Sequence, residues 1–290
     1  MSLAPSELIL NKDGSVYHLN LLPEDLADLV LLVGDPDRVP LVSRHFDMLE
    51  VKKSKREFIT HTGTLEGKRI SVLSTGIGAD NIDIVLNELD ALASLDLERR
   101  IPREVPRSLQ LVRVGTSGSL QPDIPLGAFI LSDYGMGFDG LLHYYQSEAV
   151  QRPDIQLAFL EQTRWEVLLA VPYVVPADIK LCEQLDAPEI IRGITATNPG
   201  FYGPQGRQLR LPAADPGLLN KLTSFQYEDL KILNMEMETA AILGLAGLMG
   251  HRAASLSCVL ANRATGGFSS NPGETVERLI AFALEQLLRS

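Results

Sequence analysis

Apolar and polar positions alternate along this chain in two rhythms, and each rhythm predicts one kind of element. Short runs rich in Val, Ile and Leu are typical of strands buried on both faces, and they occupy residues 29–33, 70–74, 109–114, 128–132, 190–197 and 254–260. Apolar residues at helical spacing predict helices over residues 39–46, 81–95, 177–185, 216–225, 237–248 and 274–288. Strands interleaved with helices predict an α/β protein, with a sheet that carries helices on its faces.

Length and composition add limits to this fold class. The chain has 290 residues, of which 45% are hydrophobic and 22% are charged, enough for one large domain or at most two. The longest apolar run, residues 167–175, is far shorter than the roughly 20 residues that span a bilayer, and the N-terminus does not resemble a secretory signal. Cys182 and Cys258 lie far apart in the sequence, so a reduced, cytoplasmic protein is the simplest interpretation.

The charge balance excludes some classes of partner. A formal net charge of −11 argues against nucleic acids and anionic membranes. The five histidines include no pair at zinc-ligand spacing, so they predict no metal site. Against this acidic background, a local cluster of arginines would indicate an anionic ligand.

Residues that follow the predicted strands are the candidates for a binding site, because ligands of such sheets bind at the carboxyl ends of the strands. Arg38 follows the first strand, Arg113 lies in the third, and Thr116 comes just after it. With the backbone N–H of Gly34 they predict an anion site, since a guanidinium fork bonds phosphate bidentately. Arg38 by itself is better interpreted as a surface cation. Arg113 lies inside an apolar run and needs an anionic partner if it is buried.

A loop shaped by Gly and Pro, residues 201–207, carries an amide and a guanidinium two positions apart, beside Phe201 and Tyr202. Gln205 both donates and accepts hydrogen bonds, whereas Arg207 only donates. The pair matches the edge of uracil, which alternates carbonyl, N–H and carbonyl. Cytosine would be disfavoured, because it presents an amino group where Arg207 needs an acceptor. Taken alone, the same residues are also typical of a surface turn.

The sequence Asn-Met-Glu-Met-Glu at residues 234–238 leads into an apolar helix. Glu236 and Glu238 would accept from adjacent sugar hydroxyls, and Met237 offers adaptable apolar surface. A helix start with favourable acidic residues explains the pattern equally well, so both interpretations stay open. Residues 135–140 fit Gly-x-Gly-x-x-Gly, but residues 141–145 are too few and too aromatic for the helix that a dinucleotide fold requires.

Taken together and in order, these motifs resemble the uridine phosphorylases of the nucleoside phosphorylase-I family. The resemblance covers nearly the whole chain, through residues 16–19, 34–39, 56–58, 74–78, 113–118, 201–207, 236–238 and 262–263. Each segment is weak alone, whereas their order and spacing are specific. The resemblance implies a single domain over residues 1–290, built on a central mixed twisted β-sheet flanked by helices. We expect residues 1–15 to form a flexible N-terminal segment.

The resemblance implies a role for each matching residue. Phosphate, a co-substrate in a reaction without a cofactor, would bind at Gly34, Arg38, Arg56, Arg113 and Thr116. The ribose would contact His18, Met237 and Glu238, and the base would contact Phe201, Gln205, Arg207 and Arg263. The catalytic residues among these would be Arg113, Gln205, Arg207 and Glu238.

The family's assembly is implied in the same way. His18 would reach across to the ribose 5′-hydroxyl in a neighbouring subunit, and Arg56 would join the phosphate site of that subunit. The resemblance therefore implies a dimer with shared active sites and, as is usual in bacterial members, a hexamer of three dimers. A structural monovalent cation such as K⁺ is implied near Glu57, Ile77 and Asn81, although relatives carry Ser where this chain has Asn81.

The implied reaction is the reversible phosphorolysis of uridine, deoxyuridine or thymidine to the free base and (deoxy)ribose 1-phosphate, a step of pyrimidine salvage. As the glycosidic bond stretches, the sugar becomes oxocarbenium-like, and the base gains negative charge that Gln205 and Arg207 would stabilise. The arginine cluster would hold phosphate in line with the anomeric carbon, so no side-chain nucleophile is required.

The chain departs from the family pattern in three segments. Residues 198–200, Asn-Pro-Gly, replace small polar residues at the entrance to the base pocket, and residues 96–107 and 154–171 look like insertions. We expect residues 96–107 to form an exposed loop.

Two alternative functions stay open. A purine nucleoside phosphorylase or a nucleosidase of the same fold generally has an Asp after the last core strand, where this chain has Asn262, and a hydrolase has no use for a phosphate site. A non-catalytic nucleoside-binding protein would keep the binding residues and lose turnover.

Overall fold

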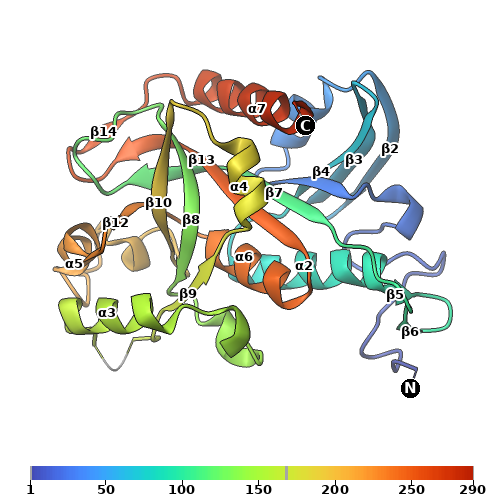
Figure 1. Ribbon diagram of the computed structural model, residues 1–290, viewed down its shortest axis with the longest axis horizontal. Helices are drawn as coiled ribbons and strands as arrows, with labels where there is room; N and C mark the ends of the chain where they lie inside the picture. Colours follow the sequence, from blue (N-terminus) through green and yellow to red (C-terminus); the bar gives the residue numbers. More distant parts are fainter. Residues whose placement is uncertain (1, 167–168, 290) are drawn as a thin grey trace.

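All six strands predicted from apolar runs lie in one mixed sheet (Figure 1). The computed structural model describes residues 2–166 and 169–289. In one half of the sheet the parallel neighbours are β1 (Leu29–Val33), β4 (Lys68–Ser74), β7 (Gln110–Ser119) and β13 (Arg252–Asn262). In the other half they are β8 (Phe129–Gly137), β10 (Ile190–Thr197) and β12 (Leu230–Glu236). The antiparallel pairing of β13 with β8 joins the halves and makes the sheet mixed.

The sheet closes on itself where β12 meets β7. β12 pairs with β10 along one edge and antiparallel with β7 along the other, through Asn234 opposite Ser119 and Met235 opposite Gly118. β7, β13, β8, β10 and β12 therefore form a closed ring, and β1 and β4 extend from it. The antiparallel hairpin of β2 (Met48–Lys55) and β3 (Phe58–Leu65) continues the sheet beyond β4. Closure brings the carboxyl ends of β7 and β12 side by side.

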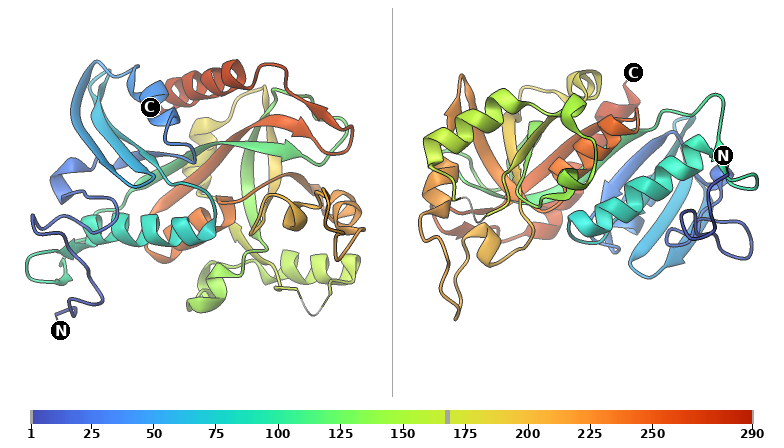
Figure 2. Two further views of the ribbon diagram at one scale, coloured as in Figure 1. Left: turned by 180° about the vertical axis from the view of Figure 1, so that it is seen from behind. Right: turned by 90° about the horizontal axis from the view of Figure 1, so that it is seen from below.

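Helices cover both faces of this sheet (Figures 1 and 2). α7 contacts α1 and α4 on one face, and α2 and α6 pack together on the other. The helices are α1 (Arg38–Ser43), α2 (Ala79–Ser94), α3 (Pro153–Thr163), α4 (Ile179–Leu185), α5 (Leu218–Ser224), α6 (Thr239–Leu248) and α7 (Pro272–Leu288). The remaining strands are β5 (Leu95–Asp96), β6 (Ile101–Pro102), β9 (Tyr173–Pro176), β11 (Gln226–Tyr227) and β14 (Gly267–Phe268).

Two strands run through glycine-containing segments that we expected to be loops. β7 includes Gly115 and β8 includes Gly137. A side-chain carbon on Gly115 would lie 1.9 Å from Nη1 of Arg113, and one on Gly137 would lie 2.2 Å from the ring of Tyr173. These glycines thus allow close packing inside strands rather than turns. The Gly-x-Gly-x-x-Gly segment belongs to β8 and a following short 3₁₀ helix, which confirms that it opens no dinucleotide-binding helix.

Polar segments concealed several elements from the sequence pattern. β2 at the sheet edge carries many charged or exposed positions, Thr, His and Gly interrupt the apolar residues of β3, and α3 shows little amphipathic contrast. Residues 96–107, expected to be a loop, contribute the short β5–β6 hairpin, and the segment 154–171 contains most of α3, with residues 167 and 168 outside the described residues.

The N-terminal segment, for which we expected flexibility, lies against the rest of the protein from residue 2 onward. The backbone N–H of Leu3 donates to the carbonyl of Arg100 at 2.8 Å, and Leu8 is buried. Residue 1 lies outside the described part of the chain.

Among the described residues, no helix combines the length and the apolar character needed to cross a bilayer.

Candidate functional site

Most of the predicted site residues line one cavity of about 720 Å³, where β1, β7, β12 and β13 end. They are Gly34, Arg38, Arg113, Thr116, Phe201, Gln205, Arg207, Met237 and Glu238. The described lining does not include His18, Arg56 or Arg263. The geometry therefore brings together the residues expected to bind phosphate, ribose and base, and it separates the two that the family resemblance assigns to a neighbouring subunit.

Arg113 is buried and has the anionic partners that its burial requires. Its Nη2 lies 2.9 Å from Oε2 of Glu236 and 2.7 Å from Oε2 of Glu238. Its Nη1 donates to the hydroxyl of Ser257 at 2.9 Å. Burial opposes the charge of the guanidinium, but the two carboxylates outweigh burial and raise the pKa of Arg113. Ser257 was not predicted; its signal is a hydroxyl inside the apolar run of β13.

The two carboxylates of the Glu-Met-Glu motif have different surroundings. Glu236 accepts from the Thr197 hydroxyl at 2.6 Å and from the backbone N–H groups of Glu238 and Thr239 at 2.9 Å, at the start of α6. Glu238 lines the cavity, where its Oε1 accepts from the backbone N–H of Gly78 at 2.8 Å. Burial raises the pKa of Glu238 despite the nearby Arg113. Both carboxylates line the cavity, and Glu236 in addition accepts from backbone N–H groups at the start of α6, so the motif forms a helix start and also lines the ligand space.

Arg38 lies in the same cavity in an environment short of negative charge. Its Nη1 donates to the carbonyl of Val114 at 3.4 Å, and in the described part of the chain no carboxylate comes within ion-pair distance. Burial, and then the positive charge of Arg113, lower the pKa of Arg38. A partly buried cation without an ion-pair partner favours an anionic ligand at this place.

The loop that contains Gln205 and Arg207 holds both side chains at the cavity wall. Gln205 is only 2% exposed, and its Oε1 accepts from Nη1 of Arg207 at 2.5 Å. Arg207 also donates to the carbonyl of Phe201 at 2.7 Å, and its guanidinium stacks 3.8 Å from the centre of the Phe201 ring. Burial, together with the charge of Arg263, lowers the pKa of Arg207 to about 10. Contacts within the loop therefore hold Gln205 and Arg207, while Phe201 and Tyr202 beside them are exposed.

Arg263 supports this loop from outside the cavity lining. Its Nη1 donates to the backbone carbonyl of Gln205 at 3.1 Å, and its stem packs 3.5 Å from where a side chain on Gly118 would begin. The preceding Asn262 is engaged in local structure. Its Nδ2 donates to the carbonyls of Gln121 and Ile124, and its Oδ1 accepts from the backbone N–H groups of residues 264 and 265.

His18 and Arg56 are brought close to each other outside the cavity. Lys55, next to Arg56 in sequence, donates to the carbonyl of Tyr17 and stacks 4.1 Å from the centre of the Tyr17 ring. The Nδ1 of His18 lies 2.7 Å from Oε1 of Glu88 on α2. Arg56 is exposed, in a left-handed conformation with φ of 55° at the tip of the β2–β3 hairpin.

The three positions expected near a monovalent cation meet at one edge of the cavity, around Gly76. Glu57, Ile77 and Asn81 all line it, and a side-chain carbon on Gly76 would lie 2.3 Å from Nδ2 of Asn81 and 3.1 Å from Cγ of Glu57. A carboxylate, a backbone carbonyl and an amide oxygen are the donors that hard cations take, so the residues fit such an ion. Among the described residues, no group of His, Cys, Asp and Glu is arranged to hold a metal.

A second cavity of about 880 Å³ lies beside the loop of residues 201–207, and Arg207 lines both cavities. Asn198 and Pro199 line this second cavity, together with Trp165 of the segment 154–171. These departures from the family pattern therefore line the second cavity. We expected residues 198–200 at the entrance to the base pocket, but Asn198 and Pro199 are not in the described lining of the candidate site.

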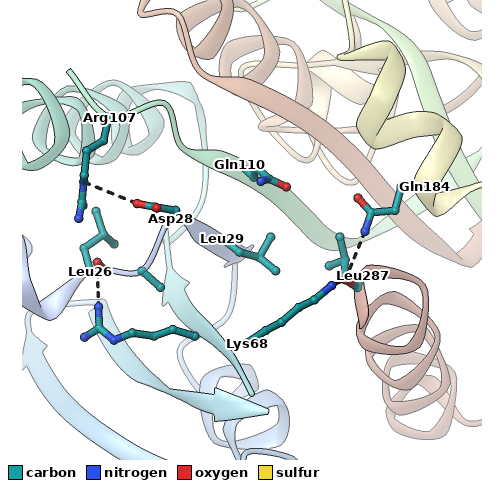
Figure 3. Close-up of a pocket in the computed structure, with 10 residues that line it drawn as sticks. Leu26, Asp28, Leu29, Lys68, Arg107, Gln110, Gln184 and Leu287 are labelled. Atoms are coloured by element: carbon teal, nitrogen blue, oxygen red, sulfur yellow. Dashed lines mark hydrogen bonds and ion pairs between the residues drawn. The ribbon is translucent and has the colours of Figure 1, made fainter. Parts of the chain in front are cut away.

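A third pocket, of about 420 Å³, lies at the opposite, amino ends of β1, β4 and β7 (Figure 3). Its charged groups pair with nearby groups. Lys68 donates to the carbonyl of Leu287, and Arg107 lies 3.6 Å from Asp28. None of the predicted site residues lines this pocket, so the candidate site is the cavity at the carboxyl ends.

Comparisons with known proteins identify the family of this chain. A family model described as "Phosphorylase superfamily" matches residues 28–288. The uridine phosphorylase of Thermococcus kodakarensis is 32% identical over 96% of this chain and 88% of its own length, and that of Haemophilus influenzae is 27% identical over 86% and 87%. A crystal structure of a Trypanosoma brucei nucleoside phosphorylase, described as showing uridine phosphorylase activity, superposes with a TM-score of 0.89 at 28% identity, covering 98% of this chain and 100% of that one. The chain belongs to the phosphorylase superfamily.

Proposed function

We propose that this member of the phosphorylase superfamily is a pentosyltransferase that catalyses the reversible phosphorolysis of uridine to uracil and ribose 1-phosphate. One observation carries the proposal. A single cavity contains buried cations for an anion, a carboxylate for a sugar, and the amide–guanidinium pair of Gln205 and Arg207 for a base. The sequence similarity to uridine phosphorylases in two other organisms supports it.

Phosphate is bound by Arg38 and Arg113, with the backbone of Gly34 and the hydroxyl of Thr116. Arg38 supplies a charge that forms no ion pair with the described residues, and burial together with the charge of Arg113 lowers its pKa. Arg113 already shares Nη2 with two carboxylates and Nη1 with Ser257. It therefore links the phosphate to Glu238 as well as contributing charge. Neighbouring N–H donors position the anion for in-line attack at the anomeric carbon.

Ribose is held by Glu238, with Met237 against the sugar. An ionised carboxylate has about four acceptor sites on its two oxygens. Gly78 and Arg113 occupy one site on each oxygen of Glu238. The remaining sites accept from two adjacent hydroxyls, which fits the 2′- and 3′-hydroxyls of a ribonucleoside.

Uracil is recognised by Gln205 and Arg207 above Phe201. The two side chains now bond each other, and the base replaces this contact with its own carbonyl and N–H groups. As the glycosidic bond breaks, the base carries negative charge, which Arg207 stabilises because it stays protonated well above neutral pH. The electron pair of the bond leaves with uracil, and a phosphate oxygen forms the new bond to the sugar.

The purine alternative is weakened by the fold around Asn262. A purine enzyme of this fold needs an acid there to protonate the leaving base, whereas the amide of Asn262 is fully engaged with the backbone of residues 121, 124, 264 and 265. A nucleosidase would use water, whereas Arg38, which lines the cavity without an ion-pair partner in the described part of the chain, favours phosphate.

The working enzyme is a homo-oligomer, at least a dimer and by family resemblance a hexamer, in which His18 and Arg56 complete the cavity of a neighbouring copy. Both residues lie outside their own cavity lining, and the exposed Ile77 (67%) marks the cavity edge where a second copy would approach. No organic cofactor is needed. A monovalent cation at Glu57, Ile77 and Asn81 would brace this edge. The buried free thiols of Cys182 and Cys258 suit a reducing, cytoplasmic location.

A phosphate-dependent assay across uridine, deoxyuridine, thymidine, inosine and adenosine tests the proposal. Uridine should be consumed with release of uracil, and only when phosphate is present. Faster cleavage of inosine or adenosine than of uridine at saturating phosphate would replace it with the purine assignment. Binding of uridine without any phosphate-dependent turnover would leave a nucleoside-binding protein.

A further inference from the structure

Glu88, on α2 and outside the cavity lining, holds the short segment that contains His18. Its Oε1 accepts from the backbone N–H of His18 at 2.9 Å and lies 2.7 Å from the ring Nδ1. Its Oε2 accepts from the backbone N–H of Leu19 at 2.8 Å. The side chains are largely withdrawn from solvent, at 26% exposure for His18 and 15% for Glu88. One carboxylate therefore fixes the backbone and the ring of the same residue.

This contact selects one arrangement of hydrogens on the His18 ring. An ionised carboxylate accepts hydrogen bonds and has no hydrogen to donate, so Nδ1 of His18 must carry the hydrogen between them. Nε2 is then the ring nitrogen that can accept from another partner. The contact between Nδ1 and Glu88 sets the direction in which Nε2 points.

The neighbouring residues keep the segment from shifting. Asn11 donates to the carbonyl of Val16 at 2.8 Å, and Lys55 donates to the carbonyl of Tyr17. Val16 and Leu19 are buried on either side of His18. The chain on both sides of His18 is thus anchored, and Glu88 is the group that orients its ring.

We propose that Glu88 is a positioning residue for the reaction. It holds His18 with Nδ1 protonated and Nε2 presented to the 5′-hydroxyl of the nucleoside bound in a neighbouring subunit. The inference rests on the proposed function and on the placement of His18 in a neighbour's site. Glu88 itself touches no substrate, so its effect passes entirely through His18.

The test compares Glu88→Gln with the wild-type protein on two substrates, uridine and 5′-deoxyuridine, with phosphate saturating. A glutamine side chain can face Nδ1 with either its oxygen or its nitrogen, so it no longer selects one ring tautomer. We expect kcat/KM for uridine to fall about tenfold, equivalent to about 1.4 kcal/mol, mainly through KM. We expect kcat/KM for 5′-deoxyuridine, which lacks the hydroxyl, to stay nearly unchanged.

The ratio of the two substrates separates positioning from structure. Both are assayed on one preparation, so any loss of folded protein cancels in the ratio. Glu98→Gln, the same charge change at an exposed residue of the β5–β6 hairpin, should leave the ratio at its wild-type value. Adding His18→Ala to Glu88→Gln should cost no more than His18→Ala alone.

Equal losses on both substrates, no loss on either, or additive losses in the double variant would overturn the role of Glu88. Failure of the proposed function is a different result, because the wild-type protein would then release no uracil from uridine with phosphate.

Discussion

At the scale of single residues, Arg113 is the cation on which the polar centre of the cavity depends. Arg113→Ala leaves Glu236 and Glu238 buried beside each other without their counter-ion. Breaking one partner of a buried ion pair costs about 3–5 kcal/mol. We expect a loss of this size in the free energy of unfolding, measured as a shift of the urea midpoint at unchanged m-value.

Arg44→Ala is the matched control for Arg113. Arg44 pairs with Glu277 at 3.2 Å, but both side chains are nearly half exposed, so its removal should cost less than about 1 kcal/mol. Equal losses in the two variants would show that Glu236 and Glu238 do not rely on Arg113.

Arg207 should separate base recognition from phosphate binding. Arg207→Ala removes the cation that faces the leaving base while leaving Arg38 and Arg113 in place. We expect kcat/KM for uridine to fall about 10²-fold, the usual effect of removing one donor to a developing anion, with little change in KM for phosphate. Arg210→Ala, at an exposed arginine three positions further along the chain, is the control in the same steady-state assay. An equal effect of both changes would indicate general electrostatics in place of a contact to the base.

Residue types and their order in the sequence were enough to predict most residues that line this cavity. The residues that hydrogen-bond to them could not be predicted. The need of Arg113 for an anion could be inferred because it interrupts an apolar run, and Glu238 then proved to be one of its partners. Ser257, Gly78 and Glu88 could not be found, because each contacts a residue far away in sequence. The hydrogen bonds of Glu236 to backbone N–H groups could be recognised only once the start of α6 was known.

At the scale of elements, the amino end of α2 supports Glu238, the carboxylate proposed to hold the sugar. Gly78 precedes α2 with φ of 96°, a conformation that side chains disfavour, and its N–H donates to Glu238. Gly78→Ala should destabilise the fold by about 1–3 kcal/mol and also raise KM for uridine, because the N–H would turn away from the carboxylate.

A glycine in a turn remote from the cavity serves as a control that separates the change in KM from the loss of stability. Gly67, between β3 and β4, has φ of 79° and open space around it, so Gly67→Ala carries a comparable backbone penalty. Thermal unfolding should report a loss in both variants, while KM for uridine should rise only in Gly78→Ala. A normal KM in Gly78→Ala would remove α2 from the sugar site.

Elements buried on both faces of the sheet were predictable, and those at its margins were not. β1 and β10 match their predicted bounds, because continuous apolar runs are required where helices cover both faces. β2 lies at the sheet edge with alternating exposed charges, so no apolar run marks it. β7 and β8 extend past their apolar runs because glycines there make room for Arg113 and Tyr173, and in sequence such glycines resemble turns.

At the scale of the whole molecule, an acidic chain concentrates several arginines in one cavity, among carboxylates. The chain carries a formal charge of −11, yet Arg38, Arg113 and Arg207 all line one cavity. The parallel pairing of β1 with β7 places Arg38 near Arg113, and ring closure brings the end of β10, which precedes Arg207, to the same side. His18 and Arg56 are not part of the described lining of this cavity. We therefore predict that one chain alone does not complete a site.

Mixed dimers test this division directly. A His18→Ala/Arg56→Ala variant keeps its own cavity intact, whereas Arg207→Ala keeps the residues that it would supply to a neighbour. Each variant alone should be nearly inactive. In a mixed dimer, the cavity of the first variant receives native His18 and Arg56 from the second, so one of the two sites is restored. Random association of equal amounts forms mixed dimers in half of the population, so activity should recover to about a quarter of the wild-type rate. Assay of the unselected co-expressed mixture would measure this recovery. Dimers selected through two different affinity tags are all mixed, so they should show about half of the wild-type rate. If His18 and Arg56 served the cavity of their own chain, no combination would create a native site, and the mixture would show only the average of the two variants.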